Sequence, residues 1–297
     1  MGGQKLMCDE NTVIENEQHL RGANVSRRHF NRLATVAAFA TLLPRTAFAQ
    51  DVVDNDVNVQ TPDGSADCYF VHPVQGEHPG VIVWPDILGL RPAFQAMGKR
   101  LAESGYSVLV VNPYYRGAKA PVVGPGASFG DAATREKVMP LARSLSATTH
   151  MTDASAFVAF LDQQAAVDTN RKIGTTGYCM GGPIVMRTAA AEPERIGAGA
   201  SFHGGGLVTD RDDSPHLLVP KMSAHFLFAI AANDDERDPE AKNVLRATFD
   251  KAGLPAEIEV YEGAMHGWCP PDSAVYNEAQ AERAWSRLLV LFETALA

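Results

Sequence analysis

Short apolar runs alternate with longer amphipathic segments along most of the chain after residue 50. The runs are rich in β-branched residues and are typical of buried strands, whereas the longer segments repeat their apolar residues at helical spacing. Strands that alternate with helices favour a mostly parallel sheet with helices on both faces. Strands are predicted at 81–84, 108–111, 172–176, 198–202, 225–231 and 257–261, and helices at 92–104, 134–144, 152–164, 183–191, 239–252 and 278–296.

An antiparallel hairpin is predicted ahead of this alternating pattern. Residues 57–60 and 66–71 are strand-like, and they flank the sequence Thr-Pro-Asp-Gly-Ser at 61–65. Proline and glycine at these places are typical of a tight turn. Cys68 is therefore expected on the second strand.

Two other segments have a local signature. Residues 117–131 are rich in glycine, proline and small side chains, with no periodicity, and such a loop predicts a functional rim or a mobile segment. The helix predicted at 152–164 is expected to begin at a cap formed by Thr152 or Asp153.

The strand at 172–176 leads directly into Gly-Tyr-Cys-Met-Gly-Gly at 177–182. A strand that enters a helix through Gly-x-Cys-x-Gly-Gly has the pattern of a nucleophile elbow, with cysteine in place of serine. The glycines allow a sharp, strained turn. A thiol at a helix N-terminus faces unpaired N–H groups and the positive end of the helix dipole, which favour the thiolate. Cys179 is therefore the predicted nucleophile, and the alternative is an inert buried cysteine beside a tight turn.

The loops after the last two predicted strands supply an acid and a histidine. Nucleophile, acid and histidine then follow one another in the chain order of the α/β-hydrolase fold, as Cys179, Asp234 and His266. We expect His266 to take the thiol proton or to hold the thiolate as an ion pair, and Asp234 to orient the imidazole. Asp235 is the first alternative for the acid, and Asp238 the second.

A backbone oxyanion hole is predicted between two loops. The N–H of Met180 follows the nucleophile, and the N–H of Ile87 lies in the loop after the first apolar strand. Asp86, beside Ile87, is either a solvated loop carboxylate or a group near the thiol that influences its ionisation. All of these loops leave the carboxyl ends of strands, where ligands bind in such sheets.

Other polar and aromatic residues are open to two interpretations. Trp268, Tyr114, Tyr115 and Phe129 are predicted as pocket walls or, equally, as core or rim aromatics. His203 and residues 210–216 have no known metal-ligand spacing, and we interpret them as residues of the pocket edge or of a surface loop.

Taken together, the elbow, the acid loop and His-Gly-Trp at 266–268 resemble the dienelactone hydrolase family over roughly residues 55–297. The resemblance implies a single α/β-hydrolase domain that cleaves an ester or lactone through a cysteine thioester, without a metal or cofactor. It also implies that Asp86 stands where the family has a glutamate near the thiol, and that Arg135 matches one of the arginines that bind the substrate carboxylate. Pro270 stands where those enzymes have an arginine for the substrate carboxylate, so that contact is absent here.

The first 49 residues have the order of an export signal. Arg27 and Arg28 form the arginine pair of a twin-arginine signal, an apolar segment follows at 33–43, and Ala-Phe-Ala at 47–49 fits a cleavage site. We therefore expect residues 1–49 to be removed and residues 50–297 to form one domain. The expected partner is the twin-arginine translocase, and the expected location is the periplasm or the medium. An N-terminal amphipathic helix of the folded domain is the alternative.

Composition narrows the remaining partners. The net charge is −9, with no basic cluster outside the first 49 residues, which argues against nucleic acid as a partner. No apolar run is long enough for a stable membrane insertion. Cys68, Cys179 and Cys269 remain once the leader with Cys8 is removed; their spacing is not that of a metal site, and all three are expected to be thiols.

The predicted function is thus hydrolysis of a small ester or lactone by nucleophilic cysteine catalysis. Two alternatives remain open at this point. The same triad could act on another acyl substrate, such as a polysaccharide ester or a thioester. The chain could instead be a non-catalytic binding protein that retains the elbow for structural reasons.

Overall fold

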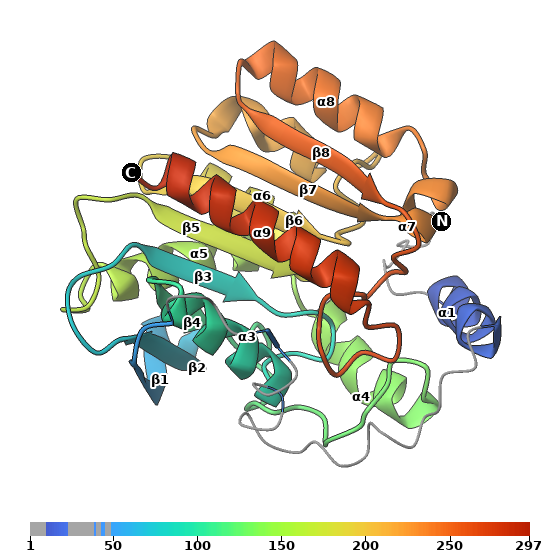
Figure 1. Cartoon of the computed structure of the whole chain (residues 1–297), viewed down its shortest axis with the longest axis horizontal. Coiled ribbons are helices and arrows are strands. Elements are labelled where there is room, and N and C mark those ends of the chain that lie inside the picture. The colour runs from blue at the N-terminus through green and yellow to red at the C-terminus, as the bar shows by residue number, and fades with distance from the viewer. Residues whose placement is uncertain (1–9, 23–38, 40–42, 45–48) are drawn as a thin grey trace.

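The computed structural model describes residues 10–22, 39, 43–44 and 49–297 of the chain. Within this part, one eight-stranded sheet has the order β1-β2-β4-β3-β5-β6-β7-β8 (Figure 1). β2 is antiparallel to β1 and to β4, and the other neighbouring strands are parallel. The mostly parallel sheet predicted from the apolar runs is confirmed. The strands are β1 Val52–Thr61, β2 Gly64–Pro73, β3 Gly80–Trp84, β4 Ser107–Val110, β5 Ile173–Tyr178, β6 Ile196–Phe202, β7 His225–Ala231 and β8 Ala256–Tyr261.

Helices cover both faces of the sheet. Successive side chains of a strand point to opposite faces, so the apolar residues of one strand pack against helices on both sides. In β3, Val81 and Val83 pack with α3 and α9, whereas Ile82 and Trp84 pack with α5 and α6. Figure 1 shows α3 and α9 in front of the sheet and α5 and α6 behind it. The helices are α1 Glu10–Gly22, α3 Pro92–Glu103, α4 Ala132–Arg143, α5 Ala147–Leu161, α6 Gly181–Ala191, α7 Ala232–Arg237, α8 Ala241–Ala252, α9 Glu278–Ala295 and the 3-10 helix η2 Pro215–Lys221.

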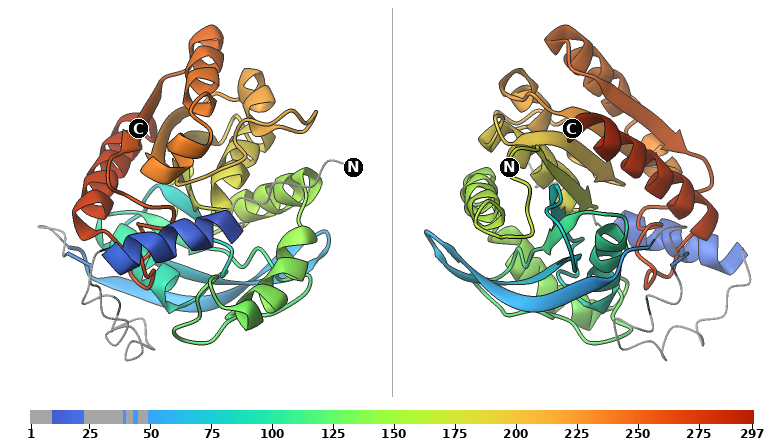
Figure 2. Two further views of the ribbon diagram at one scale, coloured as in Figure 1. Left: turned by 90° about the vertical axis from the view of Figure 1, so that its right-hand side faces the viewer. Right: turned by 60° about the vertical axis from the view of Figure 1, so that its left-hand side comes forward.

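The predicted hairpin is confirmed and is longer than expected. β1 and β2 pair from Val52 to the turn at Gly64, whose φ is 141°. Figure 2 shows this ribbon as a long, strongly twisted edge of the sheet. Cys68 lies in β2 as predicted, and its burial raises the pKa of its thiol to about 12.

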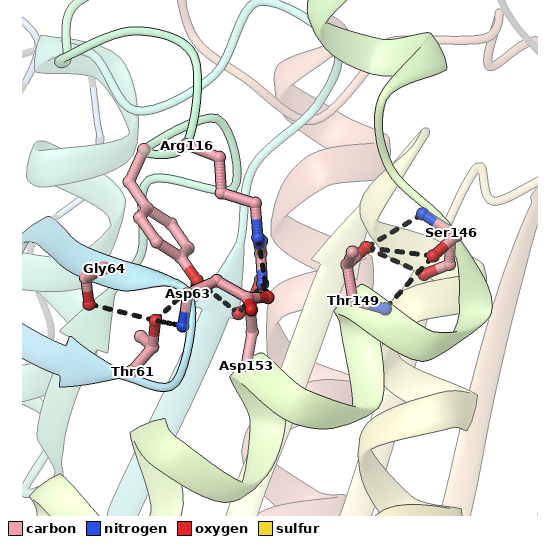
Figure 3. Close-up of polar contacts among 8 residues, drawn as sticks. Thr61, Asp63, Gly64, Arg116, Ser146, Thr149 and Asp153 are labelled. Carbon is pink, nitrogen blue, oxygen red and sulfur yellow. Dashed lines mark hydrogen bonds and ion pairs between the residues drawn. The ribbon is translucent and has the colours of Figure 1, made fainter.

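The predicted start of α5 was wrong. The helix begins at Ala147 behind a capping box, in which the Ser146 hydroxyl accepts from the N–H of Thr149 at 3.1 Å and the Thr149 hydroxyl accepts from the N–H of Ser146 at 2.9 Å. Asp153 lies inside the helix and receives two hydrogen bonds from Arg116, at 2.7 and 2.8 Å (Figure 3). The prediction failed because the cap lies ahead of the first strongly apolar residues.

The loop predicted after the strand at 225–231, which carries the acid, is also different in the structure. It forms α7, a helix of six residues that begins directly after β7, with Asp234 and Asp235 in its first turn. Acidic residues there are favoured by the positive end of the helix dipole. This turn fixes the direction in which each carboxylate points.

Two parts of the first 49 residues contact the domain in the full chain. Phe39 and Leu43 are buried among core residues of α3 and α9. α1 lies beyond the arrowheads of the strands, over the carboxyl-end edge of the sheet (Figures 1 and 2). The arginine pair lies outside the described residues, and the removal of residues 1–49 stays a prediction. Among the described helices, none is both long and apolar enough to cross a membrane.

Candidate active site

Cys179 lies at a sharp turn between β5 and α6. Its φ is 51°, in the left-handed region that residues other than glycine rarely adopt. The N–H of Cys179 donates to Phe202 O at 3.0 Å, and the N–H of Gly182 donates back to Cys179 O at 3.0 Å. A side chain on Gly181 would clash with the carbonyl of Trp84 at the end of β3. The strained elbow predicted from the glycines is therefore confirmed as a backbone feature.

His266 contacts both Asp234 and the thiol. Its Nδ1 lies 2.7 Å from Asp234 Oδ2, and its side chain also hydrogen-bonds the side chain of Cys179. The backbone N–H of His266 donates to Asn233 Oδ1 at 2.8 Å, which ties the loop after β8 to the start of α7. Asp235, the alternative acid, binds Lys242 at 2.6 Å instead. The three residues predicted from chain order are thus brought together, with Asp234 as the carboxylate on the imidazole.

The electrostatics of His266 are unusual for a buried imidazole. Burial by itself would lower its pKa, but the negative charges and hydrogen bonds of Asp234 and Cys179 raise the pKa well above its ordinary value. His266 and Cys179 are only 4% and 3% exposed, so water screens these charges little. An imidazole held between the Asp234 carboxylate and the Cys179 sulfur is placed to pass a proton to and from a reacting atom.

Tyr114 joins the two segments that carry the predicted oxyanion donors. Its hydroxyl donates to Ile87 O at 2.8 Å and lies 3.3 Å from Met180 Sδ. The side chain is 2% exposed, and it packs in a small apolar cluster that also contains Ile87 and Cys179. Sequence reasoning found Tyr114 only as a pocket or core aromatic, because no local pattern shows that its hydroxyl reaches a carbonyl 27 residues earlier.

The Asp86 carboxylate binds Arg91. The guanidinium donates to its two oxygens at 2.7 and 2.9 Å, and the N–H of Leu88 donates to Oδ1 at 2.9 Å. Arg91 also binds Asp272 at 2.6 and 2.9 Å, so it links the loop after β3 to the segment that follows His266. Asp86 is therefore not a solvated loop residue. Its influence on the thiol stays a prediction.

Arg135 holds the glycine-rich loop that precedes α4. Its Nη1 donates to the carbonyls of Phe129 and Gly130, at 3.0 and 2.7 Å. These bonds close the end of the loop predicted at 117–131 onto the first turn of α4. A role of Arg135 toward the substrate stays a prediction.

Trp268 and His203 lie behind His266 rather than in an open pocket. Trp268 is 0% exposed, stacks on Tyr261 with ring centroids 5.4 Å apart, and meets the His203 ring at 5.1 Å. A side chain so enclosed has no surface to offer a substrate. Trp268 is therefore the core aromatic of the two predicted alternatives.

The prediction that His203 lies at a pocket edge or on the surface was wrong. The residue is 1% exposed, and its ring centroid is 5.1 Å from that of His266. Its backbone continues from β6 by donating to Ala229 O at 2.8 Å, and its φ of 40° turns the side chain inward. Burial, and then the charge of His266, lower the pKa of His203 well below its ordinary value. The three glycines that follow were the one signal of an unusual backbone here.

The other described cysteines differ from Cys179 in their surroundings. Burial raises the pKa of the Cys269 thiol well above its ordinary value, and the residue packs in the core with α9. Cys68, Cys179 and Cys269 are all thiols, as expected. Among the residues that the structure describes, no three His, Cys, Asp or Glu side chains form a group that could hold a metal ion.

Comparisons with known proteins place the chain among hydrolases. The family model of the dienelactone hydrolase family matches residues 66–296. A carboxymethylenebutenolidase from Rhodococcus opacus is 26% identical over 221 residues, which cover 73% of this chain and 81% of that protein. A Bradyrhizobium protein named as a probable 2-oxo-3-(5-oxofuran-2-ylidene)propanoate lactonase is 26% identical over 239 residues, or 79% of this chain and 91% of that protein.

Solved structures show the same fold at lower identity. A dienelactone hydrolase-like promiscuous phosphotriesterase from metagenomic libraries is 20% identical, with a TM-score of 0.69 over 83% of this chain and 99% of that chain. A dienelactone hydrolase from Anabaena variabilis is 16% identical, with a TM-score of 0.59 over the same shares. The predicted α/β-hydrolase fold is confirmed.

Proposed function

Because the chain belongs to the dienelactone hydrolase family, we propose that it hydrolyses a small carboxylic ester or lactone with Cys179 as the nucleophile. The observation that supports this most is the hydrogen-bonded series from Cys179 through His266 to Asp234. This series provides a thiol nucleophile, a base beside it and a carboxylate that orients the base, which together suit the hydrolase chemistry of the family.

The first half of the reaction acylates the thiol. The Cys179 thiolate attacks the carbonyl carbon, a C–S bond forms, and the carbonyl oxygen becomes an oxyanion. The backbone N–H groups of Met180 and Ile87 would stabilise this charge. When the carbonyl re-forms, the C–O bond to the leaving alcohol breaks, and the imidazolium of His266 gives its proton to the alkoxide. In a lactone, the alcohol stays attached to the acyl group.

The second half releases the acid. Neutral His266 takes a proton from a water molecule, and the resulting hydroxide attacks the thioester carbonyl. The C–S bond then breaks, and the carboxylic acid and the thiolate separate. His266 is again an imidazolium beside a thiolate, and Asp234 stabilises that charge in both halves. The raised pKa of His266 suits the proton that it must hold between turnovers.

The named relatives favour a lactone or enol ester over other acyl compounds. A butenolidase and a furan-type lactonase both carry names of enzymes that open small oxygen rings. Pro270 stands in this chain where the family pattern has an arginine for the substrate carboxylate, so we propose the chemistry of these enzymes and not their substrate. A panel of lactones, aryl esters, polysaccharide esters and thioesters would identify the acyl class.

Substitution of the nucleophile tests the proposed function directly. Cys179→Ala should abolish turnover of a p-nitrophenyl ester, while Cys269→Ala, a matched loss of a buried thiol, should retain it once the variant is shown to be folded. Undiminished turnover by Cys179→Ala would refute the assignment. Once residues 1–49 have been removed, a Cys179 thiol that iodoacetamide alkylates no faster than a simple model thiol would favour the non-catalytic binding protein.

We also propose export through the twin-arginine route, on the arginine pair and the cleavage-site pattern of the first 49 residues. Replacement of Arg27 and Arg28 by lysine should keep the protein in the cytoplasm of an expressing bacterium. Equal recovery of the wild type and the variant from the periplasmic fraction would rule this route out.

A further inference from the structure

α1 lies over the face of the molecule that carries the triad. In the left view of Figure 2 this helix crosses in front of the domain, on the side toward which the strands point in Figure 1. Asn16 Nδ2 donates to the carbonyl of His266 at 3.1 Å. At the other side of the face, a Cβ on Gly130 would lie 3.7 Å from the side chain of Val13. α1 therefore spans from the histidine loop to the loop before α4.

One carboxylate of α1 occupies a defined pair of donors. Glu15 Oε2 accepts from Asn233 Nδ2 at 2.7 Å and from Arg237 Nη2 at 2.6 Å. Asn233 is 5% exposed, and the oxygen of the same amide accepts from the N–H of His266. The backbone N–H of His266 thus holds the oxygen of the Asn233 amide, while the nitrogen of the same amide donates to Glu15.

Arg237 links α1 to the carboxylate of the triad. Its Nη1 lies 3.3 Å from Thr12 Oγ1 and 3.8 Å from Asp234 Oδ1, while its Nη2 binds Glu15. Bonds between a guanidinium and a carboxylate are about twice as strong as bonds between neutral groups. The Glu15 contact is therefore the strongest polar attachment described between α1 and the domain.

We propose that Asn233 and Arg237 form a carboxylate-binding site beside the triad, and that Glu15 fills it so that α1 restricts access to Cys179 in the full-length chain. The expected effect on ester turnover rests on the proposed function, whereas the docking of α1 does not. Cys179 and His266 are almost fully enclosed in the full chain. Loss of the segment would expose the donors of Asn233 and Arg237 to solvent or to another carboxylate.

The composition of α1 suits a cover that can be released. An isolated helix of 13 residues is marginal in water, so α1 depends on its docking for its stability. Its described contacts with the triad loops are mostly polar, and Ile14 is 52% exposed rather than packed. Contacts of this kind contribute far less than a buried apolar face, which leaves α1 at the low-stability end of the molecule.

The test uses full-length protein with Glu15→Gln, which keeps the shape of the side chain and removes its charge. Three rates are measured: alkylation of Cys179 by iodoacetamide, turnover of a p-nitrophenyl ester, and hydrogen exchange of residues 10–22. All three should rise in the variant, by about tenfold, the scale of one lost charge-assisted hydrogen bond. Gln18→Ala, at an exposed position of α1, is the matched control and should leave the three rates near those of the wild type.

A second measurement avoids any effect of the substitution on folding. A protease recognition sequence placed within residues 23–38 allows the same folded sample to be measured before and after cleavage and removal of the released peptide. Cleavage should raise the alkylation and turnover rates to at least those of Glu15→Gln. Equal rates in the intact, cleaved and Glu15→Gln proteins would overturn the proposal and leave the hydrolase assignment standing. Faster alkylation without turnover in any sample would support the docking of α1 and count against the proposed function.

Discussion

His266 is the residue that connects the thiol of Cys179 to the carboxylate of Asp234. Its imidazole is buried, yet its pKa is raised well above 6.5, because the charges of Asp234 and Cys179 outweigh the effect of burial. Asp234→Asn keeps a side chain of the same shape and removes one of these charges. We expect the pKa of His266 to fall in this variant, as measured by NMR titration of the ring protons. Asp235→Asn, whose carboxylate binds Lys242, should leave that pKa in place.

The same shift predicts how stability depends on pH. A histidine whose pKa is higher in the folded than in the unfolded chain binds its proton more tightly when folded. Its contribution to the free energy of unfolding is therefore full below about pH 6.5, the ordinary value, and is lost as the pH rises through the raised folded pKa. Urea unfolding across this window should show the loss in the wild type and less of it in Asp234→Asn. An identical pH dependence in both proteins would contradict the raised pKa.

Tyr114 offers a second test at the scale of one atom. Tyr114→Phe removes the hydroxyl that holds the Ile87 carbonyl and lies against Met180. We expect kcat to fall by about tenfold with little change in KM, because oxyanion donors act mainly in the transition state. Tyr115→Phe is the matched control, since its hydroxyl binds Thr61 and Asp153 instead. Its unfolding free energy should fall by about 1 kcal/mol while kcat is retained.

For single residues, the order of the chain and the local sequence pattern were enough to predict Cys179, Asp234 and His266 as candidate site residues. Cys179 lies between glycines, which are typical of a strained turn. Asp234 and His266 each follow a strand, in the order expected for the fold. The sequence could not predict that His203 turns inward, because that depends on a backbone angle. Nor could it predict that Asp86 binds Arg91, because no local pattern specifies the side-chain contact between the loop after β3 and the residue that precedes α3.

Among the elements, Arg91 at the start of α3 holds two loops of the site in place. It is 6% exposed and binds both Asp86 and Asp272. Arg91→Met would leave two partly buried carboxylates without their partner, which should cost about 3 kcal/mol of unfolding free energy. Urea unfolding measures this loss. Arg283→Met, which breaks an exposed ion pair with Glu259, should cost about 1 kcal/mol or less, and a similar cost for both variants would contradict the role of the bridge.

Apolar runs predicted β3, β4 and β7 well because nearly all residues of these strands are buried, on both faces of the sheet. Helix starts were harder. The cap of α5 at Ser146 precedes its apolar residues, and α7 is too short and too acidic to show helical periodicity. These misses displaced no site residue, but they hid how the first turn of α7 selects Asp234 over Asp235.

For the whole molecule, parallel strands explain why distant loops meet, and that much follows from the sequence. The carboxyl ends of the strands share one edge, so the elbow, the acid and the histidine converge although they are far apart in the chain. The position of α1 did not follow. Its bond from Asn233 to Glu15 joins residues 218 positions apart, and no pattern of hydrophobic spacing specifies such a polar contact. Residues 1–49 were predicted as a separate segment because their sequence pattern is typical of an export signal and carries no signal of packing.

In the proposed mechanism, the acyl group of the substrate passes through the sulfur of Cys179. The most direct measurement is mass spectrometry of peptides from protein quenched in acid during turnover of p-nitrophenyl acetate. We expect one acetyl group on the peptide that contains Cys179, formed at least as fast as steady-state turnover and absent from Cys179→Ala. Turnover with no adduct on that peptide, or with the acetyl group on another residue that is needed for activity, would contradict it.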